Sequence, residues 1–386
     1  MRKEDGFVTI DIKELKGKEA LAEYDKLLIE HFTEYLDKEG YTEKMNLEPK
    51  KEIIKRVIHN ELRADSELLG YFVALLYCDY ELDDIRKAWK YPLDLLDVEI
   101  GISRLASYLF LTQTQSVFGS KSDNETDLAE ALIRLAVRSC RIGSEVCCLL
   151  RNGYPDGALA RQRTLLELEV VSKFITIKSK EVDDIGGRYL AYWAVEEMND
   201  LRENVDCLAT IEKDLRKLGP SQELTQTQKL ELERSRLRLK ELAQIVKESS
   251  AKYGDDWPGE GSFGWAWKAI GKKNPGLKDL ERAICFKEAR HIYNAGCSPV
   301  HSGPNEALFP KSGCVISPEQ LLLGRSRRGG GKSIIHTAIS MDNIMHAVCY
   351  SFSLEQLDTM YRIIYGLVDE ILQAVDDCER NLGSSR

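Results

Sequence analysis

Apolar residues recur with helical spacing along nearly the whole 386-residue chain, and this repeat constrains the fold more than any other feature. Only the stretch GFVTIDI, residues 6–12, alternates in the manner of a strand, and the sequence offers no obvious second strand to pair with it. The pattern therefore predicts an all-α protein, a helical bundle that carries a long antiparallel helical hairpin.

A polar segment, GSKSDNETD at residues 119–127, separates two groups of predicted helices. It ends in residue types that commonly begin a helix. We therefore expect a smaller N-terminal helical region at residues 1–120 and a C-terminal helical bundle domain at residues 125–382.

The second part predicts a hairpin formed by two long, charged helices at about 188–218 and 222–250, separated by Gly219-Pro220. The hairpin is longer than one bundle needs, which predicts a homodimer. Asp156 is placed to cap the helix that follows it. The other helices are expected at about 128–152, 158–178, 277–295, 333–350 and 354–381.

The charge and the termini restrict the function classes. A net charge of −9 argues against broad binding of nucleic acids or anionic membranes, which requires a basic surface. The N-terminal MRKEDGFVTID has no apolar stretch after its charges, and the most apolar run, residues 68–78, is shorter than the ~20 residues of a membrane span. We expect a cytoplasmic protein without a membrane partner.

The stretch GRSRRGGGKS, residues 324–333, ends like a phosphate-binding loop. In that motif a first glycine is separated from the Gly-Lys-Ser by four residues, but Ser326 occupies this position, and no parallel sheet is predicted before it. The simpler interpretation is a flexible turn in which Ser333 caps the next helix. The four basic side chains of this loop form a candidate site for an anion or an RNA backbone: Arg325, Arg327, Arg328 and Lys332.

The helix that contains RQRTLLELEVVSKF, residues 161–174, carries an unusual charge pattern. On a helical wheel five polar residues gather on one side: Arg161, Gln162, Glu169, Ser172 and Lys173. Arg163 and Glu167 fall on the opposite arc, among apolar residues. Because a charged pair in an apolar face needs partners, we expect Arg163 and Glu167 to be buried and to have tertiary partners. Such a pair serves either chemistry or the docking of helices.

Candidate partners of this pair lie in ARHIYNAGCSPVHSGP, residues 289–304. His301 follows a predicted helix end, and a histidine held there can act as a general base because its pKa lies near neutrality. The alternative is that His301 satisfies a buried carboxylate or caps a neighbour. We predict that His301 and Tyr293 lie near Arg163 and Glu167, as candidate catalytic residues.

Cysteine and histidine residues cluster most densely between positions 285 and 314. The cluster contains Cys285, His291, Cys297, His301 and Cys314. Their spacings are longer than the short paired spacings of structural zinc sites. We therefore predict neither a metal nor a cofactor.

Three spaced motifs resemble a bacterial all-helical domain family of unknown function, over roughly residues 125–380. They are Gly153-x₃-Gly157-Ala158-x₄-Arg163-Thr164-x₂-Glu167, Tyr293-x₄-Ser298-x₂-His301 and Gly324-x-Ser326-x₂-Gly329. In that family the Gly-rich stretch is a loop rather than a nucleotide site.

The chain is more loosely similar to HEPN helical bundles of bacterial toxins and antiviral defence proteins. That resemblance implies a metal-independent ribonuclease with an Arg-x₄₋₆-His site, in which the histidine works near the RNA 2′-hydroxyl. The sequence lacks this spacing, and the nearest instance is Arg328-x₇-His336. Nuclease activity would require distant residues, such as Arg163 and His301, to form the site together.

Three functions remain open. The first is an interaction or regulatory module in bacterial stress or phage defence, with a buried Arg/Glu/His polar centre and a protein partner. The second is a HEPN-like ribonuclease that holds RNA with the basic loop. The third is an anion or nucleotide sensor that uses residues 324–333.

Overall fold

The computed structural model describes residues 2–4, 7–11, 82–117, 122–218, 223–254, 257–287, 289–301, 308, 310–314, 320–322, 324–352 and 355–384. Most of the predicted N-terminal helical region, from residue 12 to residue 81, therefore lies outside the described residues.

The chain is all-α, as the apolar repeat predicts. The main α-helices, in chain order, are α5 (Leu82–Ala88), α6 (Lys90–Val117), α7 (Asp123–Arg151), α8 (Pro155–Lys178), α9 (Ile185–Ala191), α10 (Trp193–Leu218), α11 (Gln226–Tyr253), α12 (Trp267–Ile270), α13 (Leu277–Ala283), α14 (Ala289–Cys297), α16 (Gly331–Ser351) and α17 (Glu355–Ser384). Two short 3₁₀ helices, η3 (Gly264–Ala266) and η4 (Ser298–Val300), interrupt them.

A small antiparallel sheet accompanies the helices. The strand expected at residues 6–12 is present as β2 (Phe7–Asp11), which pairs with β1 (Arg2–Glu4) and with β3 (Gln320–Leu322). In the register, Val8 lies opposite Lys3, and Ile10 lies opposite Leu321. The second partner comes from more than 300 residues along the chain, which explains why a local pattern did not reveal it.

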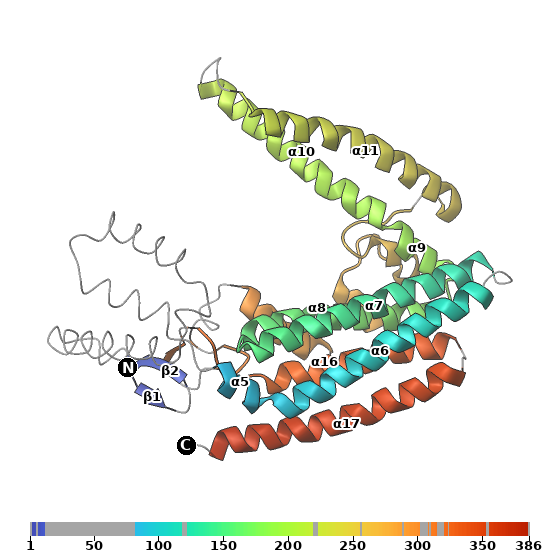
Figure 1. Ribbon diagram of the computed structural model, residues 1–386. Helices are drawn as coiled ribbons and strands as arrows, with labels where there is room; N and C mark the ends of the chain where they lie inside the picture. Colours follow the sequence, from blue (N-terminus) through green and yellow to red (C-terminus); the bar gives the residue numbers. More distant parts are fainter. Residues whose placement is uncertain are drawn as a thin grey trace.

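Helices α6, α7, α8, α16 and α17 pack side by side as an elongated bundle (Figure 1). One continuous apolar core runs through them and includes Phe110 of α6, Leu132 of α7 and Ile364 of α17. Helix α6 therefore belongs to the bundle. The division into regions 1–120 and 125–382 stays a prediction.

The turn between α7 and α8 fixes two central helices of the bundle. Helix α7 starts with a capping box formed by Ser122 and Glu125, and the chain reverses at Gly153, whose φ of +77° suits glycine. The prediction that Asp156 caps α8 is wrong, because Tyr154 is the N-cap residue and Pro155 begins the helix. Asp156 lies in the first turn, where a carboxylate complements the helix dipole.

Helices α10 and α11 form the predicted hairpin, which projects from the bundle (Figure 1); we call it the arm. Its helices pack on each other along one apolar seam with residues three and four apart, typical of a coiled coil. The seam contains Ala194, Met198, Leu201, Val205, Leu208 and Leu215 of α10, and Leu232, Leu239, Leu242 and Val246 of α11.

The arm is joined to the bundle at a compact root. Trp257 and Trp265, which follow α11, are almost completely buried, and Trp265 contacts the rings of Phe174 on α8 and Tyr189 on α9. The Tyr192 hydroxyl donates to the carbonyl of Gly261 at 2.6 Å. Trp257 and Trp265 therefore pack the root of the arm.

The helix expected at residues 277–295 is divided in two. Helix α13 ends at Ala283, and the chain turns at Cys285, whose φ is +57°, before α14 begins at Ala289. Among the described helices, none combines the length and the apolar character that a membrane crossing requires.

Candidate functional site

Helix α8 has the charged pair of interest, but its faces differ from the prediction. Gln162, Glu169 and Ser172, expected on the polar side, are buried, whereas the side chains of Arg163 and Glu167 are 27% and 32% exposed. The expectation that Arg163 and Glu167 are buried in an apolar face is therefore wrong. Neighbouring elements cover α8 on several sides, so a wheel with one inner and one outer face does not describe it.

The structure nevertheless brings Arg163, Glu167 and Tyr293 together. The Arg163 Nη2 donates to the Tyr293 hydroxyl at 2.5 Å and lies 3.1 Å from Glu167 Oε1. Helix α14 can approach because residue 296 is glycine: a Cβ there would lie 2.6 Å from the Arg163 Cβ.

A second cation borders Tyr293. The Arg163 guanidinium carbon lies 4.6 Å from the centre of the tyrosine ring, and the Arg290 guanidinium carbon lies 5.0 Å from it. Arg290 also donates to Glu281 at 2.6 and 3.1 Å. Burial raises the pKa of Tyr293, against the lowering effect of the Arg163 hydrogen bond, so the phenol stays protonated at neutral pH.

His301 follows η4 and its side chain is exposed. Within the described part of the chain, no hydrogen bond or ion pair joins it to Arg163 or Glu167. Helix η4 itself contacts α8, so His301 lies beyond the end of an element that touches the arginine-bearing helix. The role of His301 as a general base stays a prediction.

The glycine-rich stretch 324–330 is anchored to the bundle, contrary to the expected flexible turn. The Ser326 backbone N–H donates to the Gly153 carbonyl at 2.8 Å, and the Trp89 indole N–H donates to the Arg327 carbonyl at 2.6 Å. This contact explains why the first and third motifs of the sequence belong together: the turn before α8 supports the loop.

The structure around Gly331-Lys332-Ser333 matches neither a phosphate-binding loop nor a turn in which Ser333 caps the next helix. Helix α16 already begins at Gly331, and Ser333 lies buried in its first turn, so the prediction that Ser333 caps the helix is wrong. The strand before the loop, β3, is antiparallel to β2, whereas a phosphate loop follows a parallel strand.

The basic side chains of this loop are partly engaged by neighbours. Arg325 lies over the Tyr154 ring at 5.9 Å, and the exposed Lys332 donates to the Lys311 carbonyl at 3.2 Å. Arg327 and Arg328 are half-buried. Binding of an anion or of RNA by these four residues stays a prediction.

The most buried polar cluster lies elsewhere and was missed. Glu169 of α8 is buried and accepts hydrogen bonds from Lys173 at 2.9 Å and from Asn343 of α16 at 2.8 Å. Glu99 of α6 is buried, and neither of its carboxylate oxygens has a hydrogen-bond partner among the described residues. Burial raises its pKa well above the usual range. The signal was present in α8 as Glu169 and Lys173, four residues apart, but it looked like an ordinary exposed pair.

Asp342 of α16 gives this cluster a pH dependence. Burial raises the pKa of Asp342 to about 6 from its usual 3.8, while Lys173 lowers it and Glu169 raises it. Folding therefore favours the protonated carboxyl, and its contribution to stability is lost as the pH rises through about 6.

We expect Asp342→Asn to be more stable than the wild type at pH 7.5, by about 1–2 kcal/mol after allowance for partial exposure. The gain should shrink by more than half at pH 4.5, as measured by urea unfolding at both pH values. Asp206→Asn, at an exposed position of the arm, should change stability by less than about 0.5 kcal/mol at either pH. Equal gains for Asp342→Asn at both pH values would contradict the assignment.

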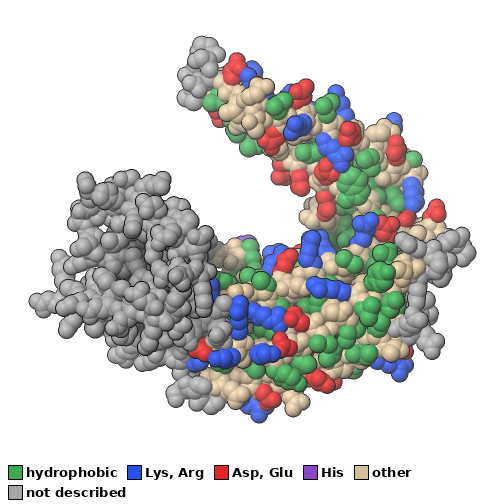
Figure 2. Space-filling model, in the orientation of Figure 1, with side chains coloured by type: hydrophobic (Ala, Val, Ile, Leu, Met, Phe, Trp, Pro, Cys, Tyr) green, Lys and Arg blue, Asp and Glu red, His purple; other side chains and the backbone are tan. Residues whose placement is uncertain are grey.

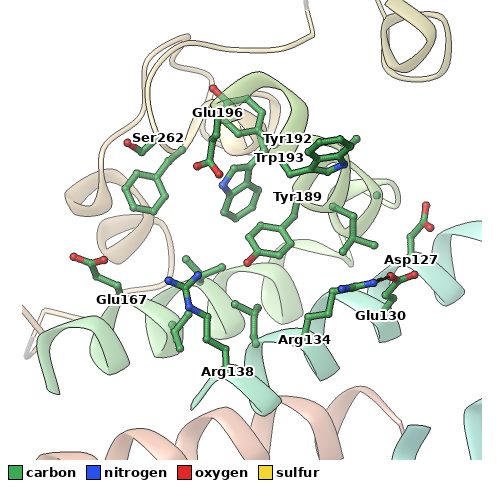
Figure 3. A pocket seen from close by; sticks show the side chains of 18 of the residues that line it. Asp127, Glu130, Arg134, Arg138, Glu167, Tyr189, Tyr192, Trp193, Glu196 and Ser262 are labelled. Atoms are coloured by element: carbon green, nitrogen blue, oxygen red, sulfur yellow. Dashed lines mark hydrogen bonds and ion pairs between the residues drawn. The ribbon is translucent and has the colours of Figure 1, made fainter. Parts of the chain in front are cut away.

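A cavity of about 770 Å³ opens between the bundle and the root of the arm. Arg134 and Arg138 of α7 and Glu167 of α8 line one side of it. Tyr189 of α9 and Glu196 of α10 line the other side, as Figure 3 shows. Glu167 thus connects the cavity to the Arg163–Tyr293 pair. Its local signal in the sequence is faint: Arg134 and Arg138 stand four residues apart on α7.

Residues that could hold a metal ion are not gathered in the described ranges: no group of three or more histidine, cysteine, aspartate or glutamate side chains has a suitable geometry there.

Residues 129–309 match a family of unknown function (DUF5677), which is less than half of the chain. Searches of curated proteins and of solved structures found no match. The matched segment begins in α7 and contains α8, the arm, most of the cavity walls and Tyr293, whereas the basic loop lies beyond it. Because the function of the family is unknown, the match supports a shared domain but no activity.

Proposed function

We propose that the chain is an interaction module that docks a partner through its arm, and that this partner is a second copy of the chain. The observation that carries the proposal is the arm itself. Its helices have 26 and 28 residues and, among the described elements, make their main contacts with each other and with α9. Most of their length therefore has no neighbour in the described part of the chain and can accept a partner.

An apolar strip remains exposed outside the seam of the arm. Leu230 and Leu237 of α11 are seven residues apart and therefore share a helix face, and they are 44% and 57% exposed. Ile211 of α10 is also partly exposed. A helical face that keeps leucines at heptad spacing in contact with water can gain free energy by packing on another helix.

The charges of the arm are segregated between its helices. Helix α10 has seven acidic and four basic side chains, and α11 has four acidic and seven basic ones. Charged side chains of both signs cover the arm surface in Figure 2. In a two-fold dimer, the acidic α10 of one copy can lie along the basic α11 of the other, and the reverse contact follows by symmetry.

We expect the wild type to be a dimer by light scattering at about 10–50 µM, a range that detects a dimer with a Kd of about 1–10 µM. The double substitution Leu230→Lys and Leu237→Lys should give a monomer, because it places cations in the apolar strip. Ile177→Lys, at an exposed apolar position of α8, should leave the dimer intact.

A monomeric wild type at these concentrations would contradict self-association. A dimer that survives the double substitution would place the contact elsewhere. The apolar face of α6 and α7, which exposes Tyr108, Leu111 and Val137, would then be the interface, and the role of the arm would be wrong.

A second candidate function is a HEPN-like ribonuclease, favoured by the partly exposed contact between Arg163 and Tyr293. A guanidinium beside a phenol can bind a phosphate and position a hydroxyl of the substrate. His301 would have to serve as the general base near the RNA 2′-hydroxyl. The setting in bacterial stress or phage defence belongs to the interaction module proposed above.

The test is incubation of labelled RNA with purified protein. If this candidate holds, the wild type cleaves RNA, and Arg163→Ala and His301→Ala each lower the rate by about 100-fold or more. Arg161→Ala is the matched control, because Arg161 pairs with Glu145 at 2.6 Å on α7. Absence of cleavage by the wild type, or equal rates in all variants, would exclude this nuclease site.

A further inference from the structure

We infer that the cavity at the root of the arm binds a small molecule that combines a flat aromatic ring, a phosphate or carboxylate group and an N–H donor. This inference concerns a separate site and does not depend on dimerisation through the arm. The cavity of about 770 Å³ lies in the range that is typical of small-molecule sites.

Most charged side chains that line the cavity already have partners. Lys252 lies 3.0 Å from Asp127, Arg134 lies 2.5 Å from Glu130, and Glu167 pairs with Arg163 outside the cavity at 3.1 Å. Within each pair the opposite charges neutralise each other, so these side chains attract a charged ligand only weakly.

Arg138 and Glu196 are the exceptions among the charged lining residues. Neither side chain makes a hydrogen bond or an ion pair with any residue in the part of the chain that the structure describes. In Figure 3, Arg138 rises from α7 into the cavity, and Glu196 faces it from α10. Burial raises the pKa of Glu196, as does Asp200, whereas Arg138 lowers it, so the two side chains act on each other across the space without touching.

Aromatic side chains occupy the remaining wall. Tyr189 and Phe263 are partly exposed to the cavity, and Trp193 is 46% exposed at its rim. The Tyr189 hydroxyl has no hydrogen-bond partner within the described ranges, and burial raises its pKa, so it remains a donor at neutral pH.

These groups define the ligand by its chemistry. A phosphate or carboxylate can accept two hydrogen bonds from the Arg138 guanidinium. A flat ring can stack on the aromatic wall. An amino or ring N–H group can donate to Glu196. Nucleoside monophosphates and aromatic amino acids share all three features.

Isothermal titration with adenosine monophosphate, guanosine monophosphate and tryptophan tests the inference and distinguishes the two sources. We expect one of these two classes to bind the wild type. Arg138→Ala should weaken that binding by about 10-fold or more, the loss typical of a charge-assisted hydrogen bond. Glu196→Gln should weaken it less, because an amide oxygen still accepts a hydrogen bond.

Arg141→Ala is the matched control: Arg141 lies one turn further along α7, outside this cavity. Circular dichroism must show that all variants are folded. The inference is overturned if none of the three probes binds the wild type at millimolar concentration, or if Arg138→Ala binds as tightly as Arg141→Ala does.

Discussion

Replacing Arg188 by alanine should lower the free energy of unfolding by about 3–5 kcal/mol, the usual cost of removing one partner from a buried ion pair. Arg188 is only 2% exposed. Its Nε donates to Asp184 at 2.9 Å and its Nη2 donates to the Tyr253 carbonyl at 2.7 Å. It therefore joins α9 to the last residue of α11. Its loss leaves the Tyr253 carbonyl without this donor and leaves Asp184 with the more distant Lys268, at 3.7 Å.

Urea unfolding at pH 7 measures this effect. Arg216→Ala is the control, because Arg216 makes an exposed pair with Glu212 in the arm, and its loss should cost no more than about 0.5 kcal/mol. Hydrogen exchange in Arg188→Ala should also be faster near the end of α11 than in α7. A loss of less than 1 kcal/mol for Arg188→Ala would mean that the arm root is held by other contacts.

Trp265→Ala should lower the free energy of unfolding by a similar amount, about 3–5 kcal/mol, because it removes a large side chain from a packed core. Trp265 is 2% exposed and meets the rings of Phe174 and Tyr189 edge-on, with ring centres 5.7 and 5.1 Å apart. The substitution creates a void between α8 and α9, which neighbouring aromatic rings are too rigid to fill.

Thermal and urea unfolding of Trp265→Ala and Trp193→Ala give a comparison within one residue type. Trp193 is 46% exposed, so its replacement should cost less than about 1 kcal/mol. Similar losses for the two variants would contradict the view that the buried tryptophan holds the root together.

The regular part of the fold was accessible from the sequence because its signals are local. The arm follows from two long periodic segments separated by Gly219-Pro220, and its ends in the structure differ from the prediction by only a few residues. Helices α7 and α16 were recognised in the same way. The helical repeat of apolar residues and the residues that end a helix are both local features, and they can be read directly from a single sequence.

The irregular parts depend on contacts between distant residues. The break at Cys285 requires a positive φ at a residue that is not glycine, which no local pattern indicates. The pairing of β2 with β3 joins residues more than 300 positions apart. The anchoring of the loop by Gly153 likewise depends on a backbone contact that the sequence does not display.

The same difference between local signals and distant contacts applies to the candidate site. The Arg163–Tyr293 contact could be guessed, because a charged side chain in a mostly apolar helix needs a partner. The burial of Gln162 and Glu169 could not, since it depends on how many helices surround α8. The cavity arises between helices and a root segment whose arrangement only the tertiary structure defines.

The seam of the arm has a consequence for how the protein can change in length. Each heptad adds about 10 Å to a helix and returns the seam to the same side. Removing or inserting seven residues in both helices, at matching positions away from the root, would therefore preserve packing and orientation. The reach of this molecule can evolve, or be engineered, in discrete steps while the rest of the chain stays unchanged.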